Sequence, residues 1–301
     1  MSIFKFIFNA LNGFMKILNS MPPYTLFGLA PKYEEAKIIV LPIPYDSATS
    51  YKTGTRDGPH EIIIASRNIE MYNEELDKDI TDIPIYTAEE LAPDINSVKG
   101  MIDRIEKEVS LILEDKKIPL VIGGDHSISI GVVDAIAKTE NRFTYLHFDA
   151  HSDSRDEYSG SKYSHACVIA RINELTSHYS VGVRSIDKDS MKFYKAILFR
   201  KDMHGLSLRE IVDLILKNTK DKIYISIDFD VLDPSQMPST GTPEPDGLSF
   251  YELKEILKTV IEKRQVIGMD FVELNPIPGL IYPNFLAAKL IYFVINYAFN
   301  K

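Results

Sequence analysis

The sequence predicts an α/β fold: a single domain built on a largely parallel sheet that is covered by helices on both faces. Short apolar runs alternate along the chain with segments whose apolar residues recur at helical spacing, a pattern typical of parallel sheets. Ser207-x-x-Glu210 and Ser249-x-x-Glu252 resemble capping boxes that open helices. No internal repeat, low-complexity segment or Pro/Gly/Ser-rich linker divides the sequence.

The expected strands are five apolar runs, taken in chain order: 37–41, 119–122, 143–148, 222–227 and 266–269. Before the second run, residues at helical spacing predict a helix over 101–113: Met101, Ile102, Ile105, Val109 and Ile112. The two capping boxes place helices before and after the fourth strand. The C-terminal run 286–299 is apolar but short and contains Lys289 and Asn296, so it predicts a buried helix.

Composition limits the classes of function. The chain has 301 residues and a net charge of -9, from 34 Lys and Arg against 43 Asp and Glu. This acidic balance argues against a nucleic-acid partner and is compatible with a cationic small molecule. A single cysteine, Cys167, excludes an intramolecular disulfide and a thiolate metal cluster. A cytoplasmic location is therefore expected.

Residues 1–20 are expected to be an N-terminal extension, followed by one domain over residues 21–301. The extension is rich in Phe and Ile, but Asn9, Asn12, Gly13 and Lys16 interrupt its apolar run, which argues against a signal peptide. We expect an amphipathic segment that packs on the body or on a neighbouring subunit. Attachment to a membrane surface is the less favoured alternative.

Polar clusters follow four of the expected strands, at the ends where open α/β sheets bind their ligands. The clusters are Gly123–Ser127, Asp149–Asp153, Asp228–Pro234 and Asp270–Pro276. Side chains alternate faces along extended backbone, so Asp149, His151 and Asp153 are expected to point the same way. The same rule brings together Asp228 and Asp230, and His126 is expected nearby from the adjacent strand end.

These residues predict a site for two metal ions. The four carboxylates would repel one another strongly in a desolvated site unless cations were present. With two imidazoles they offer too many donors for one ion, and two ions about 3.5–4 Å apart with bridging carboxylates fit better. Such mixed ligands suit Mn²⁺, Zn²⁺ or Fe²⁺. An isolated Asp-x-Asp usually caps a turn and an isolated histidine is usually structural, but the coincidence of three clusters makes those interpretations improbable.

At these residues the sequence resembles the ureohydrolases, the family of arginases and agmatinases. The resemblance runs from about Phe27 to the C-terminus and rests on three motifs, at 123–127, 149–153 and 226–234, with further matches at 44–46, 54–59 and 182–184. It implies a three-layer α/β/α fold around a mostly parallel sheet and assembly into homotrimers or homohexamers. Ser239 and Asp246 stand where relatives often carry glycine.

The resemblance also implies two Mn²⁺ ions per subunit. One ion would be held by His126, Asp149, Asp153 and Asp228. The other would be held by Asp149, His151, Asp228 and Asp230. Asp149 and Asp228 would then bridge the two ions.

The expected reaction is hydrolysis of a guanidinium group. Two cations lower the pKa of a bridging water and present it as hydroxide, which attacks the guanidinium carbon. Glu273 matches the family glutamate that pairs with the guanidinium. His165 matches the position of a proton-shuttling histidine, although an ordinary loop histidine is the alternative. Asp153 joins these two residues in the expected catalytic set.

The favoured substrate is agmatine, a small cationic guanidino compound that would yield putrescine and urea. The segments 45–59 and 155–166 look closer to agmatinases than to arginases, and the asparagine-rich loop of arginases is not recognised. Asp156 or Glu157 is a candidate to hold the ammonium end, because of charge and loop position. N1-aminopropylagmatine is a rival substrate, as is guanidinobutyrate, whose carboxylate would need a basic residue near the entrance.

Three alternatives from other classes were weighed. A deacetylase-like amide hydrolase would use a single zinc and fewer carboxylates, so the six expected ligands count against it. A non-catalytic ureohydrolase-like subunit would be signalled by a lost ligand, and none is missing. A membrane-associated interaction protein rests on the Phe-rich N-terminus alone.

Overall fold

The centre of the molecule is one sheet whose strands are all paired in parallel. The computed structural model describes residues 21–47 and 49–300, so the extension predicted over residues 1–20 lies outside the described residues. In spatial order, the strands of this sheet are β4 (Ile85–Thr87), β1 (Ile38–Ile43), β5 (Ile118–Gly123), β10 (Gln265–Val272), β9 (Lys222–Asp228), β6 (Thr144–Phe148), β7 (Ser177–Val183) and β8 (Ile197–Phe199).

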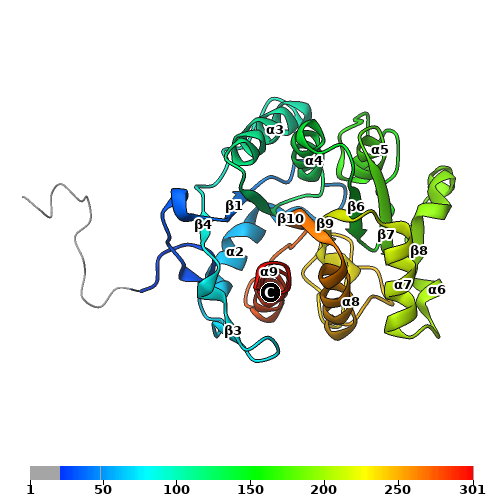
Figure 1. Cartoon of the computed structure of the whole chain (residues 1–301). Coiled ribbons are helices and arrows are strands. Elements are labelled where there is room, and N and C mark those ends of the chain that lie inside the picture. The colour runs from blue at the N-terminus through cyan, green and yellow to red at the C-terminus, as the bar shows by residue number, and fades with distance from the viewer. Residues whose placement is uncertain (1–20, 48, 301) are drawn as a thin grey trace, which may run out of the picture.

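Helices cover both faces of the sheet (Figure 1). One face carries α3 (Val98–Glu114), α4 (Ile128–Thr139) and α5 (Val168–Ile172). The other carries α2 (Gly58–Ser66), α9 (Tyr282–Phe299), α8 (Phe250–Lys263), α7 (Leu208–Asn218) and α6 (Arg200–Met203). Separate apolar cores fill the two sides. The three-layer α/β/α prediction is confirmed.

The sequence signals that predicted these elements have clear local causes. Ser207 and Ser249 each accept a hydrogen bond from the backbone N–H three residues later. The carboxylates of Glu210 and Glu252 in turn accept a hydrogen bond from the backbone N–H of the serine. Both predicted capping boxes are therefore confirmed. Helix α9 is buried over most of its length because it packs against α2 and α8, which explains its lack of a polar stripe. No helix in the described residues is long and apolar enough to cross a membrane.

The strand order determines where the polar clusters meet. The four strands that precede the clusters, β5, β10, β9 and β6, are neighbours in the middle of the sheet. Because they are parallel, their carboxyl ends lie along one edge. Residues from four distant parts of the sequence are therefore brought to one place, at the edge where α/β proteins bind ligands. A separate hairpin, β2 (Tyr72–Asn73) and β3 (Lys78–Asp79), lies outside the main sheet.

Candidate active site

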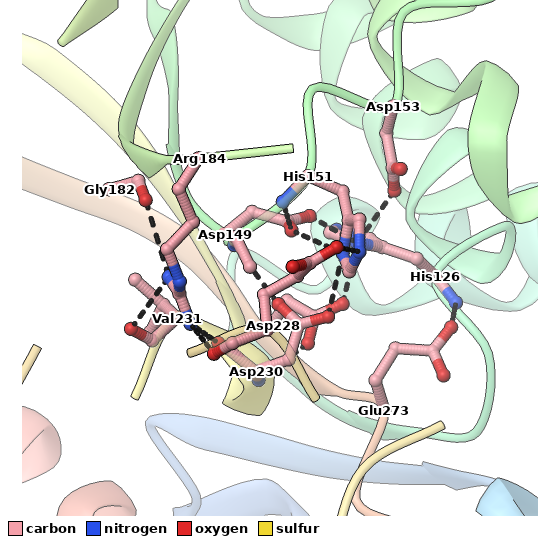
Figure 2. Close-up of polar contacts among 12 residues, drawn as sticks. His126, Asp149, His151, Asp153, Gly182, Arg184, Asp228, Asp230, Val231 and Glu273 are labelled. Carbon is pink, nitrogen blue, oxygen red and sulfur yellow. Dashed lines mark hydrogen bonds and ion pairs between the residues drawn. The ribbon is translucent and has the colours of Figure 1, made fainter. Parts of the chain in front are cut away.

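His126 lies at the centre of one group of carboxylates (Figure 2). It follows β5, and its Nδ1 atom is 3.2 Å from Oδ2 of Asp149. The same nitrogen is 3.3 Å from Oδ2 of Asp153 and 3.3 Å from Oδ2 of Asp228. Its other ring nitrogen, Nε2, lies 3.0 Å from Oγ of Ser226. The contact with Ser226 helps to hold the ring with Nδ1 toward the carboxylates.

His151 lies in a second group that shares Asp149 with the first. Nδ1 of His151 is 2.8 Å from Oδ2 of Asp230 and 3.5 Å from Oδ1 of Asp149. Asp149 therefore directs one oxygen toward His126 and the other toward His151 (Figure 2). The six predicted ligand residues all converge on this part of the sheet edge.

The backbone reaches this arrangement differently from the expected simple alternation. His151 continues the parallel pairing through a bridge to Ser185. At Asp153 the chain turns instead, with φ at 44°. Asp230 lies in a 3-10 turn, Phe229–Val231, in which its N–H donates to Oδ1 of Asp228 at 2.8 Å. The expectation of extended backbone was therefore wrong for Asp153 and Asp230, although turns still direct both side chains into the cluster.

Unpaired buried atoms indicate that the cluster suits cations. Nδ1 of His126 and Oδ2 of Asp149 are buried and lack a hydrogen-bond partner within the described residues. Burial, reinforced by the charges of Asp230 and Asp149, raises the pKa of Asp228 well above its ordinary value. Burial acts in the same direction on Asp149, but His147, His126 and His151 outweigh it and hold the pKa of that carboxyl well below its usual range. A divalent cation would offset the repulsion between the carboxylates and would give the unpaired atoms a partner.

His147 is a member of the cluster that the sequence analysis missed. It lies on β6, is fully buried, and places Nε2 2.8 Å from Oδ2 of Asp149. Two sets of possible metal-binding atoms result, each within 4.8 Å: His126, His147, Asp149 and Asp153, and Asp149, His151 and Asp230. The available signal was spacing, since His147 precedes Asp149 by two residues on the same strand and faces the same side.

A cavity of about 250 Å³ opens above the cluster. The three predicted catalytic residues, Asp153, His165 and Glu273, all line it. His165 begins a 3-10 turn, His165–Cys167, and its Nε2 is 3.3 Å from Oγ of Ser50. All three side chains therefore border the same cavity as the cluster.

Glu273 is held rigidly at the cavity wall. Its backbone φ is 66°, an uncommon value for a residue other than glycine, and its Oε1 accepts a hydrogen bond from the backbone N–H of His126 at 2.8 Å. Burial, followed by the charge of Asp125, raises the pKa of Glu273 well above its ordinary value. A substrate cation beside Glu273 would favour the charged carboxylate.

Asp187, and neither Asp156 nor Glu157, borders the cavity where the far end of a substrate would lie. Asp156 and Glu157 are not among the residues that line the cavity, and Asp156 instead pairs with Arg171 at 2.5 Å. Asp187 does line the cavity, where its side chain is 18% exposed and lies 3.8 Å from Nε of Arg155. Neither acid suggested by loop position is therefore favoured.

Arg184 connects the cluster to the neighbouring loop (Figure 2). Its guanidinium donates to the backbone carbonyl of Asp230 at 2.6 Å and to those of Glu244 and Pro245, each at 2.9 Å. This clamp fixes the turn that carries Asp230 against the 244–245 segment. The match at 182–184 noted in the sequence thus has a structural explanation.

A parallel α/β/α fold that gathers buried histidines and aspartates at the carboxyl edge of its sheet is suited to metal-dependent hydrolysis. The profile of the arginase family matches residues 36–295. The chain therefore belongs to the arginase family. It is a ureohydrolase, an enzyme that hydrolyses C–N bonds in linear amidines.

Individual relatives agree with this assignment. A protein of Thermus thermophilus named N(1)-aminopropylagmatine ureohydrolase is 39% identical over 277 residues, covering 88% of this chain and 91% of the relative. An agmatinase of Bacillus cereus is 32% identical over 254 residues, covering 82% and 86%. The crystal structure of agmatine ureohydrolase of Thermoplasma volcanium matches with a TM-score of 0.84 at 30% identity, covering 96% of this chain and 97% of that one.

Proposed function

We propose that this enzyme hydrolyses the guanidino group of a linear cationic amine and releases urea. The observation that carries the proposal is the pair of imidazole–carboxylate groups that share Asp149 at the base of the cavity. We assign one Mn²⁺ to His126, Asp149, Asp153 and Asp228, and the other to Asp149, His151, Asp228 and Asp230. When bound, such a pair of cations supplies an activated water and Lewis acidity at neutral pH.

The residues of the chain supply positioning and proton transfer. Glu273 would pair with the guanidinium, because one of its oxygens is held by His126 while the carboxylate faces the cavity. His165 would deliver a proton to the leaving amine, since its imidazole lies beside Ser50 within the same cavity. Asp153 supports the reaction through its place in the metal group beside His126.

N1-aminopropylagmatine is our first candidate substrate and agmatine the second. Agmatine was favoured on sequence patterns alone, but the Thermus thermophilus relative, at 39% identity, carries the name of the longer amine. Relatives named agmatinase are 32% identical (Bacillus cereus) and 34% identical (Pyrococcus horikoshii). Both amines have a cationic end, for which we propose Asp187, an acid that lines the cavity away from the cluster and also accepts hydrogen bonds from Asp189 and Ser190.

Guanidinobutyrate is retained because of a specific feature of the cavity. Lys52 and Arg155 both contribute to its lining, so a carboxylate would find a cation there. Arg155 is already close to Asp187, at 3.8 Å, which leaves Lys52 as the better partner. Replacement of Lys52 by Met would then lower activity on guanidinobutyrate and spare activity on the amines.

Urea release tests the proposal directly. The purified protein, loaded with Mn²⁺, is offered N1-aminopropylagmatine, agmatine, arginine and guanidinobutyrate in parallel. We expect urea from at least one of the two amines, loss of activity on chelation and recovery when Mn²⁺ is restored. Absence of urea from all four compounds, with two metal ions verified per subunit, would contradict the proposed substrate class.

We also propose a homotrimer or homohexamer in the cytoplasm, on the basis of the family resemblance. Light scattering coupled to size-exclusion chromatography measures the mass directly against the 34.2 kDa subunit. A monomer at micromolar concentration would contradict this assembly. Truncation of residues 1–20 in the same experiment tests the proposal that the extension packs on a neighbouring subunit.

A further inference from the structure

The proposed reaction leaves one buried polar side chain beside the metal groups without a role. His147 is fully buried on β6, and its ring lies 5.0 Å from that of His126, measured between centroids. Its Nε2 is 2.8 Å from Oδ2 of Asp149. Neither of these two atoms has a hydrogen-bond partner of good geometry in the described part of the chain, although they are this close to each other. They therefore face each other as a buried pair.

The other side of the His147 ring faces a serine hydroxyl, which can donate to it. Nδ1 lies 3.0 Å from Oγ of Ser180, which is buried on the adjacent strand β7. A serine hydroxyl that donates to Nδ1 leaves the proton of a neutral imidazole on Nε2. That proton then faces Asp149. The sequence Ser180–His147–Asp149 thus forms a polar chain across two strands of the sheet.

Asp149 is the residue for which orientation matters most. Its Oδ1 accepts a hydrogen bond from the backbone N–H of His151 at 2.5 Å, whereas its Oδ2 faces Nδ1 of His126 at 3.2 Å. A carboxylate shared by two ions must keep both oxygens correctly directed, and side chains behind such ligands commonly fix them. His147 lies on the Oδ2 side, where the backbone offers no such contact within the described residues.

We propose that His147 is a positioning residue of the metal centre, which donates from Nε2 to Oδ2 of Asp149 and directs that oxygen to the ion beside His126. The 2.8 Å separation is within hydrogen-bond range, and the proposal requires a rotation of the Asp149 carboxylate that aligns it with the Nε2–H donor. This inference rests on the proposed metal-dependent function. It differs from direct ligation by His147, which the same proximity would permit.

Two substitutions separate positioning from ligation. His147→Gln keeps an N–H donor at a similar reach, whereas His147→Leu removes it. Equilibrium dialysis with elemental analysis of bound Mn²⁺ gives the dissociation constants. We expect His147→Leu to weaken one of the two ions by about 10–100-fold and His147→Gln to remain close to the wild type. Equal weakening in both variants would indicate direct ligation, and wild-type binding in His147→Leu would remove any role; either result overturns the proposal.

Matched controls use neighbouring buried residues. His178 is also buried, on β7, but its Nδ1 contacts Asn173 at 2.8 Å, so His178→Leu should not change Mn²⁺ affinity. Ser180→Ala removes the partner of Nδ1 and should weaken Mn²⁺ less than His147→Leu does. If His147→Leu does not fold, Ser180→Ala decides, and unchanged affinity there overturns the proposal.

The same measurements distinguish this inference from the proposed function. A wild-type protein that fails to bind two Mn²⁺ ions refutes the metal-dependent function itself. A wild type that binds two ions and releases urea, with unchanged affinity in His147→Leu, refutes only the role of His147.

Discussion

At the scale of single residues, the site is defined by carboxylates that oppose one another's ionisation. Asp228 and Asp149 are both buried, yet the pKa shifts of the two carboxyls are opposite in direction. The difference arises because burial and neighbouring acids dominate at Asp228, whereas three imidazoles outweigh burial at Asp149. A cation between them would make both carboxylates stable as anions. Exchange of a single residue here changes charge balance as well as geometry.

Asp187 gives a prediction about substrate affinity. If it holds the cationic end of the amine, Asp187→Asn should raise KM roughly tenfold, equivalent to about 1.4 kcal/mol, with a smaller change in kcat. Steady-state kinetics on N1-aminopropylagmatine and agmatine measure both constants. Asp156→Asn is the matched control, because Asp156 pairs with Arg171 outside the cavity lining. The same KM in Asp187→Asn as in the wild type would remove Asp187 from substrate binding.

His165 gives a prediction about the chemical step. Proton transfer by a positioned side chain contributes typically about 10²–10⁴-fold, so His165→Asn should lower kcat within this range while changing KM little. Metal content is the internal control, because His165 belongs to neither group of possible metal-binding atoms. Full activity in His165→Asn would support the alternative of an ordinary loop histidine.

At the scale of elements, Glu75 connects the β2–β3 turn to two helices. It accepts from Lys254 of α8, from Lys258 of α8 at 3.1 Å and from the Tyr297 hydroxyl of α9 at 2.9 Å. Burial opposes ionisation, but these donors outweigh it and lower the pKa of Glu75 to about 2. The native state therefore binds this proton less readily than the unfolded chain.

The stability contributed by Glu75 is present above the unfolded pKa and is lost as pH falls toward the native value. Glu75→Gln should lower the free energy of unfolding at pH 7 by about 1 kcal/mol, because the group is partly solvated. Urea denaturation at pH 7 and pH 3 should show the difference from wild type narrowing in acid. Glu262→Gln, at an exposed position of α8, is the control and should leave the free energy of unfolding unchanged at both pH values. A constant difference at both pH values would argue against the ion pairs.

Gly124 shows how backbone packing builds the site. A Cβ added there would lie 1.8 Å from the carbonyl oxygen of Tyr45, and the Gly124 carbonyl accepts from the N–H of Glu273 at 2.9 Å. Gly124→Ala should destabilise by about 3 kcal/mol and displace His126 and Glu273. Thermal unfolding and Mn²⁺ affinity measure the two effects.

Gly205→Ala is the control for Gly124→Ala. Gly205 has a φ of +83°, and an added Cβ there would meet nothing within 4 Å. We expect a cost of about 1 kcal/mol from backbone conformation alone and no change in Mn²⁺ affinity. A Gly124→Ala variant that behaves like this control would contradict the close approach to Tyr45.

The sequence predicted those elements whose burial follows a simple pattern. Strands β5, β6, β9 and β10 are predominantly apolar runs followed by polar clusters, because buried parallel strands need apolar residues on both faces. Strand β7 was missed because it carries the polar residues Ser177, His178 and Ser180, which break the apolar pattern. In the fold, Nδ1 of His178 contacts Asn173 and Oγ of Ser180 contacts His147. Strands β4 and β8 have three residues each, too few for a periodic signal.

The candidate site was predictable as a set of residues but not in its detail. Motif spacing identified the six expected ligands, and it could not show that Asp153 and Asp230 arrive through turns. His147 was hidden because it lies inside an otherwise apolar strand. Asp246 has a φ of 63°, a left-handed conformation that glycine adopts without strain. This conformation explains why the family resemblance leads one to expect glycine at this position. Long-range neighbours, such as Arg184 and the Glu244 carbonyl, follow only from the assembled fold.

At the scale of the whole molecule, the sheet order couples the site to overall stability. The proposed ligand residues follow three central strands, β5, β9 and β6, so repulsion among them acts on the most buried part of the structure. Cations that bind only the folded state then stabilise the entire domain by mass action. Metal content should therefore be visible in global unfolding as well as in catalysis.

Metal removal tests this coupling. With free Mn²⁺ at 100 times its dissociation constant, each site should add about 2.7 kcal/mol to the free energy of unfolding of the metal-free protein. The two sites together should raise Tm by roughly 10 °C. Scanning calorimetry measures this change in Tm. Mg²⁺, which prefers oxygen ligands alone, should stabilise less at the same concentration. Asp230→Asn should lose part of the Mn²⁺-dependent rise, whereas Asp213→Asn, at an exposed position of α7, should retain all of it. Identical melting curves with and without Mn²⁺ would contradict a metal centre built from these residues.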